Sequence, residues 1–167
     1  MVLNHVSSSH PWVQQFIKSQ EPGISNVFSP RQNLDWSNVV RPRSSSLFSQ
    51  INTEDGPKQV WTTFGPDQID LNWHNPKMTL EFLNLIVNYL SNGIKWFRLD
   101  AVGFIWKESG TTCLHLPKAH SIVKLLRVLL NNLLDDGVLI TETNVPQKEN
   151  LSYLIPDDEA HMAYNFP

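Results

Sequence analysis

Two short apolar runs that each end in a carboxylate constrain this chain more than any other feature. The runs read FRLD at residues 97–100 and LITE at residues 139–142, and a helical pattern precedes each of them. Strand, helix and strand in this order are typical of the βαβ unit of an α/β protein, whose parallel strands end at one edge of the sheet. In βα-repeat folds the chemistry takes place at that edge. We therefore predict that Asp100 and Glu142 lie close together at the mouth of a parallel sheet.

Two amphipathic helices are predicted before these strands. The first starts at Asn75-Pro76, an N-cap followed by proline at the first helical position, and SNG at residues 91–93 ends it. The second starts at Pro117, and DDG at residues 135–137 ends it. The predicted apolar stripes are Leu80, Leu83, Ile86, Val87 and Leu90 in the first helix, and His120, Val123, Leu126, Leu130 and Leu133 or Leu134 in the second.

The stretch from residue 7 to residue 74 is predicted to be a long, irregular excursion. It contains six prolines and sustains neither the period of a strand nor that of a helix. We predict three parts: a strand tip in residues 1–6, an insertion subdomain in residues 7–74, and the helices and strands of residues 75–167. A complete (β/α)8 barrel takes roughly 250 residues, so a chain of 167 is either a smaller fold or a fragment.

Composition and charge narrow the classes of partner. The chain is 41% hydrophobic with a net charge of −3, which gives no electrostatic reason to expect nucleic acid or an anionic membrane. It has no apolar stretch of 18 residues, no signal-peptide pattern at its start and a single cysteine, Cys113. It also lacks a Gly-rich phosphate loop and a paired-cysteine metal motif. We expect a cytoplasmic globular protein with no resident cofactor or metal.

The neighbours of the two acids predict different protonation states. Arg98 lies two residues before Asp100 on the same strand face, so its positive charge should lower the pKa of that carboxyl. Glu142 shares its face with Val138 and Ile140, and an apolar setting raises a carboxyl pKa. An ionised Asp100 suits a nucleophile and a protonated Glu142 suits a general acid; titration that finds Asp100 the more basic would reverse these roles. The alternative is a structural Asp–Arg ion pair with Glu142 as a solvated loop acid.

Four motifs in order resemble the conserved regions of the α-amylase superfamily, glycoside hydrolase family 13. They are NH at residues 4–5, QIDLN at 68–72, FRLDA at 97–101 and ITETN at 140–144. The wider strings at residues 39–44, 60–64 and 103–107 resemble most the sucrose phosphorylase subfamily, which includes enzymes acting on sucrose, glucosylglycerol and glucosylglycerate. The resemblance implies an incomplete TIM (β/α)8 barrel, about strands 3–6, with an insertion after strand 3.

The resemblance also implies catalytic roles. Asp100 would be the nucleophile that forms a glucosyl-enzyme ester, Arg98 would orient it, and Glu142 would be the acid/base. The implied reaction converts an α-glucoside and inorganic phosphate into glucose 1-phosphate. The alternatives are an α-glucosidase or amylase-type hydrolase, and a truncated remnant that folds poorly or only binds. The family's third catalytic acid follows the seventh strand and has no counterpart here, so we expect the 167 residues alone to be inactive.

Four further residues are implied as substrate-binding candidates by the same resemblance. His5 would bind hydroxyl groups of the glucosyl unit, and Asn4 would support the end of its strand. Gln68 and Asp70 lie in the motif that precedes the first predicted helix, and for these two a purely structural role in the loop is the alternative.

Overall fold

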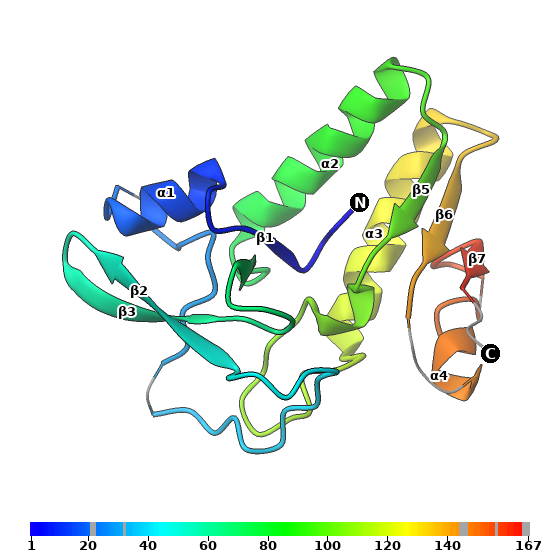
Figure 1. Cartoon of the computed structure of the whole chain (residues 1–167). Coiled ribbons are helices and arrows are strands. Elements are labelled where there is room, and N and C mark those ends of the chain that lie inside the picture. Colours follow the sequence, from blue (N-terminus) through cyan, green and yellow to red (C-terminus); the bar gives the residue numbers. More distant parts are fainter. Residues whose placement is uncertain (21–22, 32, 144–146, 156, 165–167) are drawn as a thin grey trace. The chain divides into compact units, whose positions relative to one another are not determined.

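The computed structural model describes the chain except for residues 21–22, 32, 144–146, 156 and 165–167 (Figure 1). The chain divides into two compact units. Unit 1 comprises Met1–Leu3, Thr79–Gly103 and His115–Pro167, and unit 2 comprises Asn4–Met78 and Phe104–Leu114. The division predicted from the sequence concerns the parts of a barrel, and it stays a prediction.

Unit 1 contains a parallel sheet with the strand order β5-β6-β7. The strands are β5 (Trp96–Leu99), β6 (Val138–Thr141) and β7 (Met162–Ala163). Arg98 pairs in register with Ile140, and Ile140 pairs with Met162 on its other side. Because residues paired in register point to the same face, these three side chains share one face of the sheet. The predicted parallel pairing of the two acid-bearing strands is confirmed.

The helices of unit 1 follow the predicted starts, but only one buries the predicted stripe. In α3 (Pro117–Leu133) the side chains of Val123, Leu126 and Leu130 are buried as predicted. In α2 (Pro76–Ser91), which belongs to unit 1 from Thr79 onward, the buried side chains of that part are those of Phe82 and Ile86, whereas Leu80 of the predicted stripe is 59% exposed. The sequence of α2 places apolar residues around most of the helix circumference. The helical periodicity alone therefore does not identify the face with the bulky Phe82 as the buried one. The predicted stripe was right for Ile86, which is buried, and wrong for Leu80 and Val87, which are exposed.

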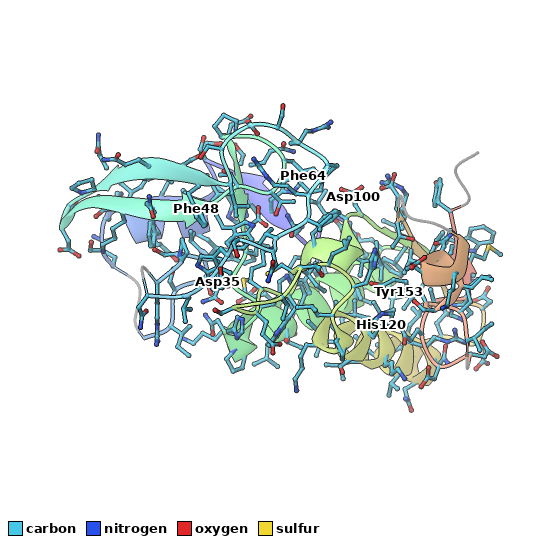
Figure 2. All side chains as sticks on the ribbon, turned by 90° about the horizontal axis from the view of Figure 1, so that it is seen from below. Asp35, Phe48, Phe64, Asp100, His120 and Tyr153 are labelled. Atoms are coloured by element: carbon cyan, nitrogen blue, oxygen red, sulfur yellow. The ribbon has the colours of Figure 1, made fainter. Side chains whose placement is uncertain are left out.

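A buried polar cluster in unit 1 fixes the turn that follows Asp100. The 3-10 helix η1 (Val102–Phe104) begins there, and the carbonyl oxygen of Gly103 accepts a hydrogen bond from the His115 backbone at 2.8 Å. The His115 ring lies so close to Gly103 that an added Cβ would be 2.4 Å from its Cε1. The Nδ1 of His115 bonds the hydroxyl of Tyr153 at 2.8 Å, and the Tyr153 ring stacks on His120 (Figure 2). Tyr153 follows the short helix α4 (Gln147–Leu151), so the cluster joins segments that come after both acids.

Unit 2 is more regular than the sequence predicted. It holds α1 (Pro11–Ile17), the antiparallel pair of β1 (His5–Ser7) and β4 (Gln68–Asp70), and the hairpin of β2 (Phe48–Thr53) and β3 (Gly56–Trp61). Its buried apolar core contains Val13, Phe16, Val27, Val60 and Ile69. Pro57 does not prevent the hairpin, because both strands of a two-stranded sheet are edges where a missing N–H is tolerated. The expectation of a wholly irregular excursion was wrong for this reason.

Within the described ranges, none of the helices has both the length and the apolar character needed to cross a lipid bilayer.

Candidate active site

Three charged side chains meet at the carboxyl end of the sheet in unit 1. Asp100 directly follows β5 and Glu142 directly follows β6. The Glu142 backbone N–H donates to the carbonyl oxygen of Leu99 at 3.0 Å and so continues the hydrogen-bond ladder between the two strands. The Nη2 of Arg98 donates to Asp100 Oδ1 at 3.1 Å and also to Glu142 Oε2. A single guanidinium nitrogen therefore bridges the two carboxylates. The predicted convergence of Asp100 and Glu142 is present.

The protonation order of the two acids is the reverse of the predicted one. Burial, followed by a hydrogen bond and charge repulsion from Glu142, raises the pKa of Asp100 to about 6. The hydrogen bond with Asp100, together with the Arg98 guanidinium, lowers the pKa of Glu142. The prediction was wrong because burial of Asp100 and its contact with Glu142 outweigh the effect of Arg98, which also binds Glu142. Two carboxyls in contact share a proton, so the pair titrates as one system.

A second charged cluster lies buried in unit 2 around Asp70. Its carboxylate accepts hydrogen bonds from Asn4 Nδ2 at 2.9 Å and from the Thr63 N–H and hydroxyl at 2.9 and 2.6 Å. The Lys107 ammonium completes the set at 2.7 Å, and the side chains of Asp70 and Lys107 are 0% and 2% exposed. Asn4 Oδ1 accepts from the same Lys107 Nζ at 2.9 Å. This burial favours the structural alternative for Asp70, and Asn4 joins the start of β1 to that cluster.

His5 and Gln68 form a separate polar pair on β1 and β4. Their Nε2 atoms are 2.9 Å apart, and the His5 ring packs against Phe64 with centroids 5.3 Å apart. Partial burial lowers the pKa of His5, which favours the neutral ring near pH 7. If the Gln68 amide donates, the proton of the neutral ring resides on Nδ1, so His5 presents a donor on that atom. The sugar-binding roles of both residues remain predictions.

Neither cluster resembles a metal centre. In the part of the chain that the structure describes, no group of three or more His, Cys, Asp or Glu side chains is placed to hold a metal ion. The charged groups are matched to one another instead, with Arg98 on two carboxylates and Lys107 on Asp70. A retaining glycosidase takes its nucleophile and its proton donor from a pair of carboxyl groups, and the Asp100–Glu142 pair is of this chemical type.

Comparison with known proteins identifies the family of the chain. The sequence profile described as "Alpha amylase, catalytic domain" matches residues 1–167. The chain belongs to the alpha-amylase catalytic domain family. The glucosylglycerate phosphorylase of Allomeiothermus silvanus is 46% identical over 168 residues, which cover 100% of this chain and 30% of the relative. The enzyme of the same name from Escherichia coli is 44% identical, over 99% of this chain and 30% of the relative. The chain thus spans about a third of the length of these curated relatives.

Solved structures of the family support the fold. The sucrose 6F-phosphate phosphorylase of Thermoanaerobacter thermosaccharolyticum superposes with a TM-score of 0.82 over 99% of this chain and 36% of that chain, at 22% identity. An alpha-glucosyl transfer enzyme, XgtA, gives the same TM-score at 19% identity, over 98% of this chain and 36% of that one. The fold is therefore related to the TIM barrel of this family. In the described residues the sheets remain open, with three strands as the largest.

Lys107 and Thr63 are buried polar residues of the Asp70 cluster that sequence reasoning missed. Both lie in the strings that carried the family resemblance, residues 103–107 and 60–64, yet neither was given a role. A lysine within an aromatic, apolar string was the available signal, because lysine is almost never fully buried unless it is paired. The Trp61 indole N–H donates to Thr63 Oγ1 at 3.1 Å, which explains why the aromatic residue accompanies the cluster.

Proposed function

We propose that this chain forms the acid-bearing part of a retaining α-glucoside phosphorylase that acts on glucosylglycerate. The observation that carries the proposal is the convergence of Asp100 and Glu142 on Arg98 at the ends of adjacent parallel strands. Relatives named glucosylglycerate phosphorylase, identical at 46% and 44% of positions, support the choice of donor and of phosphate as acceptor. The chain spans about a third of these relatives, so the activity belongs to a longer barrel that contains it.

The proposed reaction has two steps. In the first, an Asp100 carboxylate oxygen bonds to the anomeric carbon while the Glu142 carboxyl transfers its proton to the glycosidic oxygen, and glycerate leaves. In the second, an oxygen of hydrogen phosphate displaces Asp100 from the anomeric carbon while its proton passes to Glu142, which regenerates the Asp100 carboxylate and the Glu142 carboxyl and releases glucose 1-phosphate. Two inversions give net retention of configuration. Arg98 contacts both carboxylates and thereby orients them before the donor binds.

The roles rest on motif position, and substrate binding must redistribute the shared proton. In the described arrangement Asp100 has the higher pKa, so below about pH 6 the proton of the pair resides on the residue that has to attack. A glucosyl unit bound between the carboxyls would separate them and leave Arg98 to stabilise Asp100. Glu142 then loses the hydrogen bond with Asp100 that lowers its pKa. Its carboxyl therefore keeps a proton more readily and can transfer that proton to the glycosidic oxygen.

The activity on α-glucosyl fluoride, whose leaving group needs no proton, should fall as the pH drops below about 6. Asp100 attacks only as the carboxylate, and its pKa is raised to about 6, so the fraction of ionised nucleophile decreases as pH falls through that value. The measurement is kcat/KM for phosphorolysis of this fluoride between about pH 4.5 and 8, which reports the pKa values of the free enzyme. With glucosylglycerate the pair must also keep the proton that Glu142 donates, so kcat/KM for that donor should fall as the pH rises above about 6. An acid limb at the ordinary aspartate value of about 4 would show that Asp100 does not share its proton with Glu142.

A chimaera tests the proposal directly. Residues 1–167 replace the matching segment of the Escherichia coli glucosylglycerate phosphorylase, and glucose 1-phosphate release is assayed from glucosylglycerate, sucrose and glucosylglycerol. We expect phosphorolysis of glucosylglycerate, with the unmodified Escherichia coli enzyme as the reference. A folded chimaera that releases free glucose instead would support the hydrolase alternative. A folded chimaera without either product would support the remnant.

The 167-residue chain by itself should show no phosphorolysis and should aggregate. Trp96 is 62% exposed and Met162 48% exposed, and both lie on the sheet face that carries Arg98. In a closed barrel that face is covered by layers of side chains from the other strands. Exposed apolar faces and open strand edges favour association. The check is light scattering and the glucose 1-phosphate assay on the isolated chain and on the chimaera at equal concentration; turnover comparable to that of the chimaera would contradict this account.

A further inference from the structure

We propose that Tyr164 is a positioning residue that holds the Arg98 guanidinium against the two carboxylates, with Asn150 as its anchor. The inference deepens the proposed function and rests on it for the identity of the reaction. The ends of three consecutive parallel strands each place one group at this site: Asp100 after β5, Glu142 after β6 and Tyr164 after β7. The first two are acids, and the third is an aromatic ring for which the catalytic motifs give no role.

The contact between Tyr164 and Arg98 is a cation–π interaction. The Cζ atom of Arg98 lies 5.4 Å from the centroid of the Tyr164 ring, within the range in which a guanidinium is attracted to an aromatic face. The same guanidinium donates to both carboxylates through Nη2. The Arg98 side chain is 41% exposed, so sheet packing alone does not fix it. The ring and the two acids together therefore define where the positive charge resides.

Asn150 anchors Tyr164 and ties it to the Glu142 segment. Its Nδ2 donates to the backbone carbonyl of Tyr164 at 2.6 Å, and its Oδ1 accepts from the Thr143 hydroxyl at 2.5 Å. Asn150 and Thr143 are 8% and 4% exposed, so water competes little for these bonds. The Tyr164 backbone N–H also donates to Thr141 at 2.9 Å. Thr141 therefore binds Tyr164 directly, and Thr143 binds it through Asn150. Because these two threonines flank Glu142, a displacement of Tyr164 would also displace the Glu142 segment.

The position of Arg98 influences how the two acids titrate. Its charge favours the ionised form of each carboxyl and opposes the burial and the contact with Glu142 that raise the pKa of Asp100. A ring that confines the guanidinium keeps this stabilisation constant. Without the ring, Arg98 would sample positions away from the acids, and both carboxyls would become more basic. Tyr164 contacts Arg98 rather than the reacting atoms, so it acts on the reaction through Arg98.

Paired substitutions in the chimaera separate the ring from the hydroxyl. Tyr164→Phe keeps the ring and should leave kcat and the pH profile close to those of the unsubstituted chimaera. Tyr164→Leu removes the ring and should lower kcat roughly three- to tenfold, with a smaller change in KM and with the acid limb displaced to higher pH. Asn150→Asp removes the donor to Tyr164 and adds a negative charge near Glu142, so it should displace the limb in the same direction.

A second readout does not depend on turnover. Carbon-13 NMR titration of labelled aspartate and glutamate carboxyls should show the Asp100–Glu142 pair titrating at higher pH in Tyr164→Leu and unchanged in Tyr164→Phe. A Leu variant with unaltered carboxyl titration would overturn the inference, as would a Phe variant that is as impaired as the Leu variant. If the chimaera lacks phosphorolysis, the proposed function fails while the carboxyl titration still decides the role of Tyr164.

Discussion

Replacement of Asp100 by asparagine in the chimaera is expected to lower kcat by a factor on the order of 10⁴ or more, the scale seen when a catalytic nucleophile is removed. The amide has nearly the shape of the carboxylate and still accepts from Arg98, so the fold should persist. What is lost is the oxygen nucleophile that forms the ester. The loss should be equal for glucosylglycerate and for α-glucosyl fluoride, because both donors need the same attack on the anomeric carbon.

Glu142→Gln is the matched control for this prediction. A fluoride leaving group needs no protonation, so this variant should lose activity on glucosylglycerate while still consuming α-glucosyl fluoride. In this variant the fall in kcat/KM for α-glucosyl fluoride at low pH should occur below about pH 6, because Glu142 no longer contributes to the raised pKa of Asp100. If Asp100→Asn retains fluoride turnover and Glu142→Gln does not, the two roles are exchanged, as the protonation order in the unliganded chain alone would suggest.

The parallel arrangement of β5 and β6 was predictable because its determinants are local. Residues 94–99 are mostly apolar, and residues 138–140 are continuously apolar before Thr141. The Gly-containing breaks at 91–93 and 135–137 mark where the preceding helices must end. The placement of Asp100 and Glu142 at one edge follows from parallel pairing alone. The hairpin of β2 and β3 was not predicted, because Pro57 and polar residues hide its alternation when the partner strand is unknown.

The electrostatics of the site were less accessible because they depend on contacts between strands. Within β5, Arg98 is the only charged neighbour of Asp100 that alternation reveals, and from that view the pKa of Asp100 should fall. Register places Arg98 opposite Ile140, two residues before Glu142, so the guanidinium reaches the second acid as well. The contact of Tyr164 with Arg98 comes from a third strand. Likewise, Lys107 and Asn4 are separated by 103 residues in the sequence, and no local pattern joins them.

Lys107→Met should destabilise the protein more than any other single substitution at the two clusters. Asp70 is completely buried, and its carboxylate would lose the only cation within bonding distance among the described residues. Breaking one partner of a buried ion pair typically costs about 3–5 kcal/mol, because it leaves an uncompensated charge. The Asn4 oxygen would also lose its donor, since Lys107 binds both groups. Equilibrium urea denaturation of the chimaera, followed by tryptophan fluorescence, measures the loss.

The double variant Asp70→Asn with Lys107→Met is the control that isolates the charge. Removing both charges leaves neutral groups of similar size, and the introduced amide can still accept from the Thr63 N–H, so most of the stability should return. The double-mutant cycle then gives a coupling free energy comparable in size to the loss in Lys107→Met. Additive effects of the two substitutions would show that Lys107 stabilises unit 2 through its cation–π contact with Trp61, whose ring centroid lies 5.7 Å from Nζ, and not through Asp70. In that case the buried network would be a consequence of the aromatic core rather than the element that joins β1 to β4.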